Sequence, residues 1–159
     1  MISLRKVTRA NGAVLQNLFQ FFCHDLAGVD EPLPMKNGRY VLENFSLYYT
    51  HPGMESFLIC EGESPVGFVV VSVPPHFMDA YCVQHLFVLN GHRRKGIATE
   101  AVTSVFRRFR GAYRVGQPFE YEPSIEFWKT VYAKEGITYR DAIEGEGLDK
   151  ERVQRFVVP

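Results

Sequence analysis

The sequence predicts an α/β fold in a single domain that spans residues 1–159. Short β-rich segments alternate with amphipathic helical segments along the whole chain. No internal repeat, low-complexity tract or linker divides the sequence. A chain of this length can also close one hydrophobic core, so the pattern requires no second domain.

The N-terminal half is expected to contain two helices and three strands. Residues 2–7 are typical of an edge strand, and residues 13–26 place apolar side chains at helical spacing. Two prolines and two glycines interrupt the pattern in "AGVDEPLPMKNG", which predicts a loop before a shorter helix at residues 39–48. Residues 56–61 and 66–73 are β-rich and are joined by "GESP", which indicates a hairpin.

The C-terminal half is expected to alternate strands with two further helices. Residues 81–89 are apolar on both faces, which is typical of a strand in the centre of a sheet. The helix predicted at residues 97–109 carries one apolar stripe and ends before Gly111. The remaining predicted elements are a strand at residues 113–119, a helix at residues 124–134, and closing strands at residues 137–142 and 152–158.

The charge balance argues against a protein that binds polyanions. The 18 Lys and Arg residues equal the 18 Asp and Glu residues, so no net field favours nucleic acid or an anionic membrane. The N-terminus lacks the apolar stretch of a secretory signal, and the longest apolar run, at residues 66–73, is too short to span a bilayer. We therefore expect a cytoplasmic protein with neither a nucleic-acid nor a membrane partner.

Metal and disulfide chemistry are not expected. The cysteines are odd in number, widely spaced and set in apolar surroundings, which is typical of small core residues. They are Cys23, Cys60 and Cys82. Three histidines, His51, His76 and His92, are dispersed among turn residues, which argues against a metal site.

The stretch "NGHRRKGIATEA" at residues 90–101 joins the predicted buried strand to an amphipathic helix. Its glycine, Gly96, lies where the first helical N–H groups have no partner within the helix. Those groups and the helix dipole favour an anion, and a residue without a Cβ lets the backbone approach it closely. Arg93, Arg94 and Lys95 add positive charge. A solvated charged turn and a nucleic-acid patch are the alternatives at this point.

This stretch resembles the pyrophosphate loop of a known family. "HRRKGIA" matches the Arg/Gln-x-x-Gly-x-Gly/Ala motif of the GNAT N-acetyltransferases, with Arg93, Gly96 and Ala98 at the motif positions. The segment "PSIEFWKTVYAKEGITY" resembles the closing helix of the family, in the Phe-Trp version of a bacterial subgroup. The resemblance covers nearly the whole chain. It implies the GNAT acyl-CoA acyltransferase fold, a mixed central sheet with splayed middle strands flanked by helices.

The resemblance implies an acyl-CoA site, with acetyl-CoA or coenzyme A as the bound group and no metal. Backbone groups of Phe87 and Leu89 are expected to pair with the pantetheine arm in the gap between the splayed strands. The pyrophosphate is expected at the helix start, held chiefly by backbone N–H groups. The implied cofactor-binding residues are Phe87, Val88 and Leu89 on the strand, Arg93, Arg94, Lys95, Gly96, Ile97, Ala98 and Thr99 in the loop and helix start, and Trp128 on the closing helix.

In this family an amine attacks the thioester directly, and a tyrosine protonates the leaving thiolate. That tyrosine aligns with Trp128, which has no acidic proton to give. Tyr132 lies one turn later on the same helix face, and Tyr121 takes the place of the motif asparagine, so either is a candidate acid. Tyr132 is equally compatible with a purely packing role.

His85 is the candidate base. Strand alternation places it on the same face as Phe87 and Leu89, and a neutral imidazole is a competent base near neutral pH. A satisfied core histidine is the alternative interpretation. Glu120 and Glu122, at the end of the neighbouring strand, are candidates to relay a proton through water, and the alternative is that both are simply solvated.

A group of polar residues gathers around the loop after the first helix, in the region that shapes the acceptor pocket of this family. The residues are His24, Asp25, Asp30 and Glu31. They are placed either to attract a cationic amine or simply to form a solvated loop.

These observations predict an acyl-CoA-dependent N-acyltransferase that transfers the acyl group to the amine of a small molecule by direct attack. The alternative is a non-catalytic acyl-CoA binding or sensing module, which the substitution at Trp128 makes credible. We expect a monomer or a homodimer.

Overall fold

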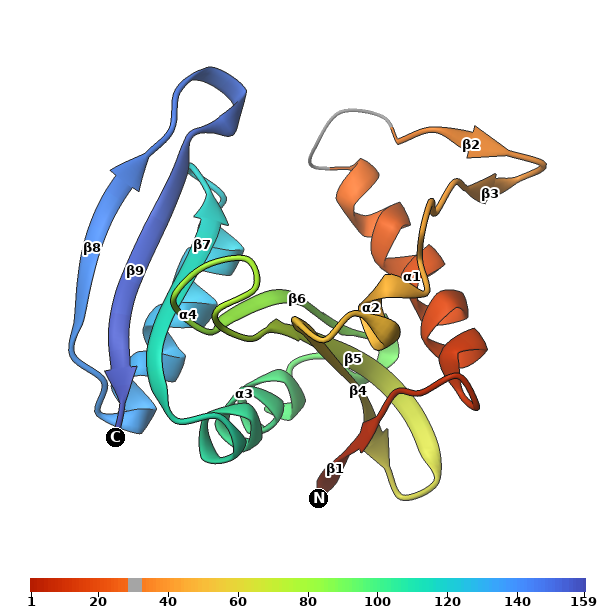
Figure 1. Cartoon of the computed structure of the whole chain (residues 1–159), viewed down its shortest axis with the longest axis horizontal. Coiled ribbons are helices and arrows are strands. Elements are labelled where there is room, and N and C mark those ends of the chain that lie inside the picture. The colour runs from red at the N-terminus through yellow and green to blue at the C-terminus, as the bar shows by residue number, and fades with distance from the viewer. Residues whose placement is uncertain (29–32) are drawn as a thin grey trace.

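The computed structural model describes residues 1–28 and 33–159, and within them it contains two larger antiparallel sheets flanked by helices and one short two-stranded sheet (Figure 1). This architecture confirms the predicted α/β class. The two sheets touch at one end and diverge from that point, so the molecule has a split along its middle.

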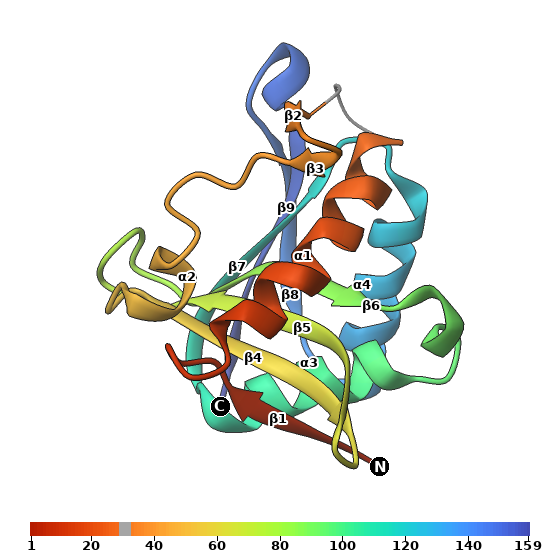
Figure 2. The same ribbon diagram turned by 90° about the vertical axis from the view of Figure 1, so that its right-hand side faces the viewer.

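The N-terminal sheet has four strands in the order β1-β4-β5-β6. Helix α1 (Gly12–Ala27) packs on one face, where Phe19 stacks on Phe68 with 5.2 Å between the ring centroids. Helix α3 (Ile97–Arg108) covers the opposite face (Figure 2). The strands are β1 (Ile2–Lys6), β4 (Met54–Glu61), β5 (Ser64–Ser72) and β6 (Cys82–Val88).

The C-terminal sheet has three strands in the order β7-β9-β8. Helix α4 (Glu122–Glu135) packs on its inner face beside α3, and Tyr113 stacks on Phe156 there with 5.2 Å between the ring centroids. The remaining elements are β7 (Gly111–Pro118), β8 (Tyr139–Glu144), the short 3-10 helix η2 (Gly147–Asp149) and β9 (Glu151–Val158).

The two sheets are joined through a short parallel contact between Tyr81 and Tyr113. The N–H of Tyr81 donates to the carbonyl of Ala112, and the N–H of Arg114 donates to the carbonyl of Tyr81, each over 2.9 Å. Beyond this contact β6 and β7 separate (Figure 1). The split that the family resemblance implied is therefore present, and it lies between these two strands.

The second predicted helix, at residues 39–48, is wrong over most of its length. Arg39–Tyr40 forms strand β3, which pairs with β2 (Met35–Lys36) across a turn in which Asn37 and Gly38 have φ of 53° and 77°. The "NG" pair supplies the left-handed conformations that a tight hairpin turn requires, and the propensity argument overlooked it. A one-turn helix, α2 (Leu47–Thr50), remains at the end of the segment.

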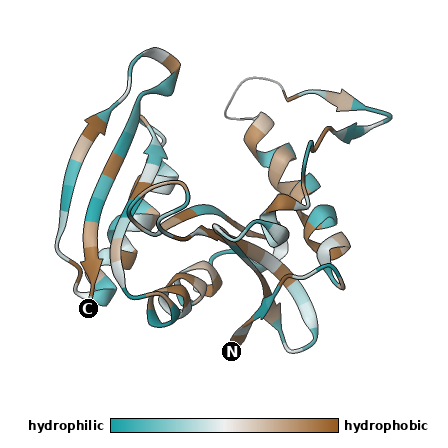
Figure 3. Ribbon diagram, viewed as in Figure 1, coloured by the Kyte–Doolittle hydropathy of each residue, from teal (hydrophilic) through white to brown (hydrophobic). Residues whose placement is uncertain are grey.

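The other predicted elements are present within a few residues of their expected bounds. All three cysteines are buried free thiols, as expected. Strand β6 is central to the molecule, although it is the last hydrogen-bonded strand of its own sheet. Figure 3 shows the apolar character of α1, which buries one face and leaves Phe21 57% exposed on another. Within the described ranges, no helix has the length and apolar character needed to cross a membrane.

Candidate active site

A cavity of about 520 Å³ lies between β6, the end of β7 and α4. Its walls are mostly apolar and aromatic, with a few polar groups, which is typical of a ligand site. Residues from five parts of the chain line it: Phe22, Asp25 and Leu26 from α1; residues 83–88 from β6; Arg93 and Ala98 beyond β6; Gly116 and Pro118 from β7; and Tyr121, Pro123, Ser124, Phe127 and Trp128 at α4.

Strand β6 carries a bulge where it borders this cavity. Val70 of β5 pairs with His85 and Val71 pairs with Val83, so Gln84 is an additional residue in β6. The Gln84 side chain donates from Nε2 to Oγ of Ser72 over 3.0 Å. A bulge bends the strand and leaves one residue outside the regular ladder. The sequence pattern gave no sign of this irregularity.

The edge of β6 that faces the gap belongs to Leu86 and Val88. The N–H of Leu89 donates to the carbonyl of Val66 over 2.8 Å, so its backbone is directed toward β5. Successive residues of a strand direct their backbone groups to opposite edges. The backbone groups of Phe87 therefore point toward β5, like those of Leu89, and the backbone groups of Val88 point toward the gap. The predicted pairing of a ligand with Phe87 and Leu89 is therefore wrong by one residue.

The loop after β6 ends in a helix start with free N–H groups. Its 3-10 turn η1 (Asn90–His92) is followed by Arg94 and Gly96, which have φ of 63° and 78°. The first bond of α3 runs from the N–H of Glu100 to the carbonyl of Gly96 over 3.0 Å, and no side chain of the described residues caps the N-terminus. The N–H groups before Glu100 therefore have no partner within the helix, which is the arrangement that an anion site at this position would need.

The side chain of Arg93 is engaged with the protein. Its Nε donates to the carbonyl of Val88 over 2.7 Å, and its terminal nitrogen lies 2.5 Å from a carboxylate oxygen of Asp25. Its guanidinium also lies 5.4 Å from the centroid of the Phe87 ring. Arg93 therefore ties the end of α1 to the end of β6, a role that the motif did not predict. Positive charge for an anion comes from the exposed Arg94 and Lys95.

The polar residues His24 and Asp25 lie in the last turns of α1, and they do not form one acidic cluster in the described part of the chain. Asp25 is paired with Arg93, and Nδ1 of His24 lies 3.1 Å from the hydroxyl of Tyr40. The predicted residues Asp30 and Glu31 lie outside the described residues.

His85 lines the cavity and also contacts the core. Its Nε2 lies 3.2 Å from the hydroxyl of Tyr48, which comes from α2. The rings of Phe19 and Phe22 meet the imidazole edge to face, with centroids 5.5 and 5.3 Å away. Burial lowers the pKa of His85 from 6.5 to about 4, so the imidazole is neutral and weakly basic at neutral pH. The sequence did not indicate Tyr48 as a partner.

Tyr132 lies away from the cavity, in the core between α4 and the C-terminal sheet. It is 2% exposed, and its hydroxyl donates to Oε1 of Gln154 over 3.1 Å. Burial, together with the nearby Tyr139, raises the pKa of this phenol well above its usual range. The structure therefore favours the packing role that was one of the two interpretations of Tyr132.

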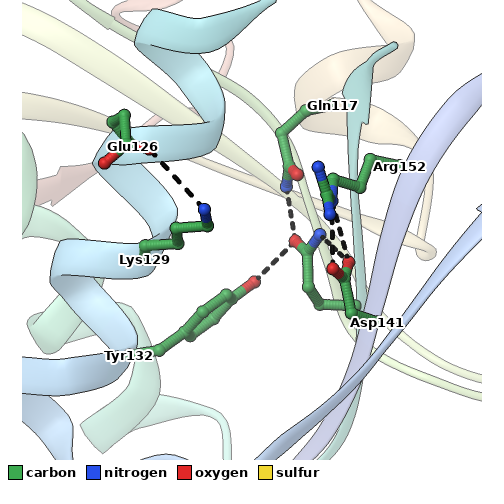
Figure 4. Close-up of polar contacts among 7 residues, drawn as sticks. Gln117, Glu126, Lys129, Tyr132, Asp141 and Arg152 are labelled. Atoms are coloured by element: carbon green, nitrogen blue, oxygen red, sulfur yellow. Dashed lines mark hydrogen bonds and ion pairs between the residues drawn. The ribbon is translucent and has the colours of Figure 1, made fainter. Parts of the chain in front are cut away.

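A polar network surrounds that hydroxyl (Figure 4). Gln117 donates to the same Gln154 oxygen over 2.6 Å, and Gln154 donates to Asp141 over 3.0 Å. Asp141 is held in turn by Arg152 over 3.0 Å. The hydroxyl of Tyr132 thus stabilises the contact between α4 and β9, and it does not point at the site.

Tyr121 and Trp128 both line the cavity, whereas Glu122 does not. Tyr121 lies at the N-terminus of α4 and is 36% exposed, while Trp128 is 6% exposed and lies about two turns further along the helix. Glu122 is exposed beside Tyr121. Among the residues that the structure describes, no three His, Cys, Asp or Glu side chains gather as a metal site would require.

Comparison with protein families gives a match to the acetyltransferase (GNAT) family over residues 16–130. Among curated proteins, none matches the chain. The family match covers most of α1, the bulged strand β6, the loop before α3 and most of α4.

Several solved structures share the fold at low identity. An acetyltransferase from Thermus thermophilus gives a TM-score of 0.71 at 16% identity, over 98% of this chain and 96% of that chain. Diaminobutyrate acetyltransferase from Paenibacillus lautus was solved with L-2,4-diaminobutyric acid and coenzyme A. It gives a TM-score of 0.67 at 15% identity, over 99% of this chain and 95% of that chain. Spermidine N-acetyltransferase from Vibrio cholerae, solved with CoA and spermine, gives a TM-score of 0.66 at 12% identity, over 99% of this chain and 95% of that chain.

Proposed function

Because the chain belongs to the GNAT acetyltransferase family, we propose that it transfers an acetyl or related acyl group from acyl-CoA to the amine of a small molecule. The CoA complexes of the diaminobutyrate and spermidine enzymes support the donor, and the amines in those structures support the acceptor class. We further propose that the chain acts in the cytoplasm as a single domain, either as a monomer or as a homodimer.

The helix start at α3 is the observation that carries this proposal. Ala98, in the first turn, lines the cavity, so the free N–H groups border the space where a ligand would lie. A Cβ built at Gly96 meets no atom within 4 Å, which leaves open space beside the loop. Arg94 and Lys95 add charge from the solvent side. These groups suit a pyrophosphate, which is anionic and accepts several hydrogen bonds.

The exposed edge of β6 suits the extended arm that follows the pyrophosphate. An arm that runs from the loop along this edge passes Val88, then Leu86, and reaches the bulge at Gln84 and His85. Phe127 and Trp128 form the wall on the opposite side. The reacting end of the donor is therefore proposed to lie beside the bulge.

Bound acetyl-CoA supplies a thioester carbonyl that an amine can attack and a thiolate that can leave. The amine nitrogen bonds to the carbonyl carbon, the C–S bond breaks, and one proton passes from nitrogen to sulfur overall. We assign the bulged Gln84 N–H to the carbonyl oxygen, where negative charge develops. Tyr121 is the proposed proton donor to sulfur, with Glu122 beside it to exchange protons with water. His85 is proposed to contact the amine or the carbonyl.

A valine at Gly96 tests the site, because a β-branched side chain there enters the space proposed for the pyrophosphate. The matched control is Gly62→Val, since Gly62 in the β4–β5 hairpin also has positive φ (57°) and open space around its Cβ position. Both variants carry similar backbone strain. We expect CoA to raise the melting temperature of the wild type and of Gly62→Val but not of Gly96→Val. An equal shift in all three proteins would remove the loop from the proposal.

Turnover separates the enzyme from the CoA-binding module. Thioester consumption with a panel of small amines, followed as free thiol, is expected for the enzyme. Tight CoA binding without consumption across the panel would support the non-catalytic alternative, which Trp128 at the usual tyrosine position favours.

A further inference from the structure

The imidazole of His85 has two different environments, one for each nitrogen. Nε2 lies 3.2 Å from the hydroxyl of Tyr48. Nδ1 has no hydrogen-bond partner within residues 1–28 and 33–159, and the residue lines the cavity. The ring is held between Phe19, Phe22 and Tyr48, each of which meets it at a steep angle with centroids 5.3 to 5.6 Å away. The packing therefore fixes which nitrogen is left for a ligand.

We infer that Tyr48 is a positioning residue whose hydroxyl donates to Nε2 of His85 and so fixes the neutral imidazole with its proton on Nδ1. His85 then presents an N–H donor to the cavity. The inference rests on the proposed function only for the chemistry that this donor serves, because the hydrogen bond itself belongs to the free protein.

The direction of the hydrogen bond follows from the two groups. A phenol O–H is a better donor than an imidazole N–H, and the lone pair of a neutral imidazole is a better acceptor than a phenol oxygen. Burial keeps both groups uncharged at neutral pH, because it lowers the pKa of His85 to about 4 and raises the pKa of Tyr48. In the reverse direction, the Tyr48 hydroxyl would need a second acceptor, and the described residues provide none.

Tyr48 is itself held in place. Its carbonyl accepts a hydrogen bond from Oγ of Ser56 over 2.6 Å, which ties the one-turn helix α2 to strand β4. Its ring packs against Phe45 and Phe19, with 5.2 Å between centroids in each pair. The phenol can therefore set the orientation of the imidazole.

This assignment changes the role expected for His85. A nitrogen that already carries a proton cannot take one from the amine, so His85 donates a hydrogen bond to a lone pair in the cavity. The amine proton must leave by another route, through water or through Tyr121. In histidine generally, the hydrogen bond at one ring nitrogen determines whether the other nitrogen carries the proton.

Nitrogen NMR of the free protein tests the inference without any substrate. In protein labelled with ¹⁵N-histidine at neutral pH, long-range ¹H–¹⁵N correlations show which ring nitrogen carries the proton, and the signals absent in His85→Gln assign the residue. We expect the Nδ1–H form in the wild type, loss of that form in Tyr48→Phe, and no change in Tyr49→Phe. Tyr49 is the neighbouring tyrosine of α2 and makes no hydrogen bond to His85.

An Nε2–H form or a cation in the wild type would overturn the inference, even if Tyr48→Phe failed to fold. So would an unchanged Nδ1–H form in a folded Tyr48→Phe. Once an acceptor is known, Tyr48→Phe should lower kcat by roughly ten-fold or more with KM for acetyl-CoA nearly unchanged. The control Tyr49→Phe should alter neither constant. Absence of turnover in the wild type would count against the proposed function and leave the NMR result standing.

Discussion

Replacing His85 with glutamine should remove a pH-dependent part of the stability of the protein. Burial lowers the pKa of His85 from 6.5 to about 4, so below pH 6.5 the unfolded chain binds a proton that the folded protein excludes. Stability therefore falls as the pH falls through 6.5, and the loss continues until the pH nears 4. Glutamine has no such titration, and its side chain can still accept a hydrogen bond from Tyr48.

The size of the effect follows from the two pKa values. Between about pH 7.5 and about pH 5, one imidazole with these values lowers the free energy of unfolding by about 2 kcal/mol. This free-energy difference changes little if the folded-state pKa lies one unit higher or lower. Across this pH range the unfolded chain still takes up more of the proton than the folded protein does.

Urea unfolding at the two pH values measures this difference directly. The wild type should lose about 2 kcal/mol more than His85→Gln on acidification, because all other titrating groups are common to both proteins. His76→Gln, at an exposed histidine, is the control and should behave as the wild type does. Equal losses in the wild type and in His85→Gln would refute the buried, neutral state of the imidazole.

Three further predictions concern the proposed CoA site and the core residue Tyr132. CoA affinity should fall as salt rises, and Lys95→Gln should weaken binding and reduce this salt dependence in titration calorimetry, because the exposed charge is screened. A salt-independent affinity would contradict the pyrophosphate site proposed at the start of α3. Tyr132→Phe should lower the free energy of unfolding by about 1 to 2 kcal/mol, since Gln154 loses a buried hydrogen-bond donor. It should leave kcat unchanged. A loss of turnover in a variant of unchanged stability would show that Tyr132 has a catalytic role. Tyr121→Phe should lower kcat by roughly two orders of magnitude, because the hydroxyl of this cavity-lining residue is the proposed proton donor to sulfur. The melting temperature should change little, because the Tyr121 side chain is exposed. A parental rate would show that the thiolate leaves unassisted.

Much of the fold could be predicted because local patterns decide it. The apolar stripe of α3 and the β-rich runs of β4 and β5 fixed both the type and the place of these elements. The helix predicted at residues 39–48 failed because turn chemistry at Asn37 and Gly38 outweighed helical spacing. The helix start after Gly96 could be predicted for a local reason as well, since a glycine before a helix start requires no distant partner, and its role as an anion site stays a prediction.

The parts of the site that could not be predicted depend on contacts between distant residues. Periodicity places His85 on one face of a strand, but it does not show that Tyr48, 37 residues earlier, meets it. Alternation also cannot tell which edge of β6 faces the gap, so the expected pairing was one residue out. Helical spacing put Trp128 and Tyr132 on one face, yet the cavity ends at Trp128 and Tyr132 contacts β9.

The separation of β6 from β7 also has a consequence for self-association of the protein through its strand edges. A strand edge with free N–H and C=O groups can template pairing with another chain, and the gap leaves such an edge along β6 inside a folded protein. The guanidinium of Arg93 occupies one of these acceptors, the carbonyl of Val88, and Asp25 holds it there. The same contact that ties α1 to β6 therefore also removes one free acceptor from this edge and so reduces its capacity to pair with the strand of another chain.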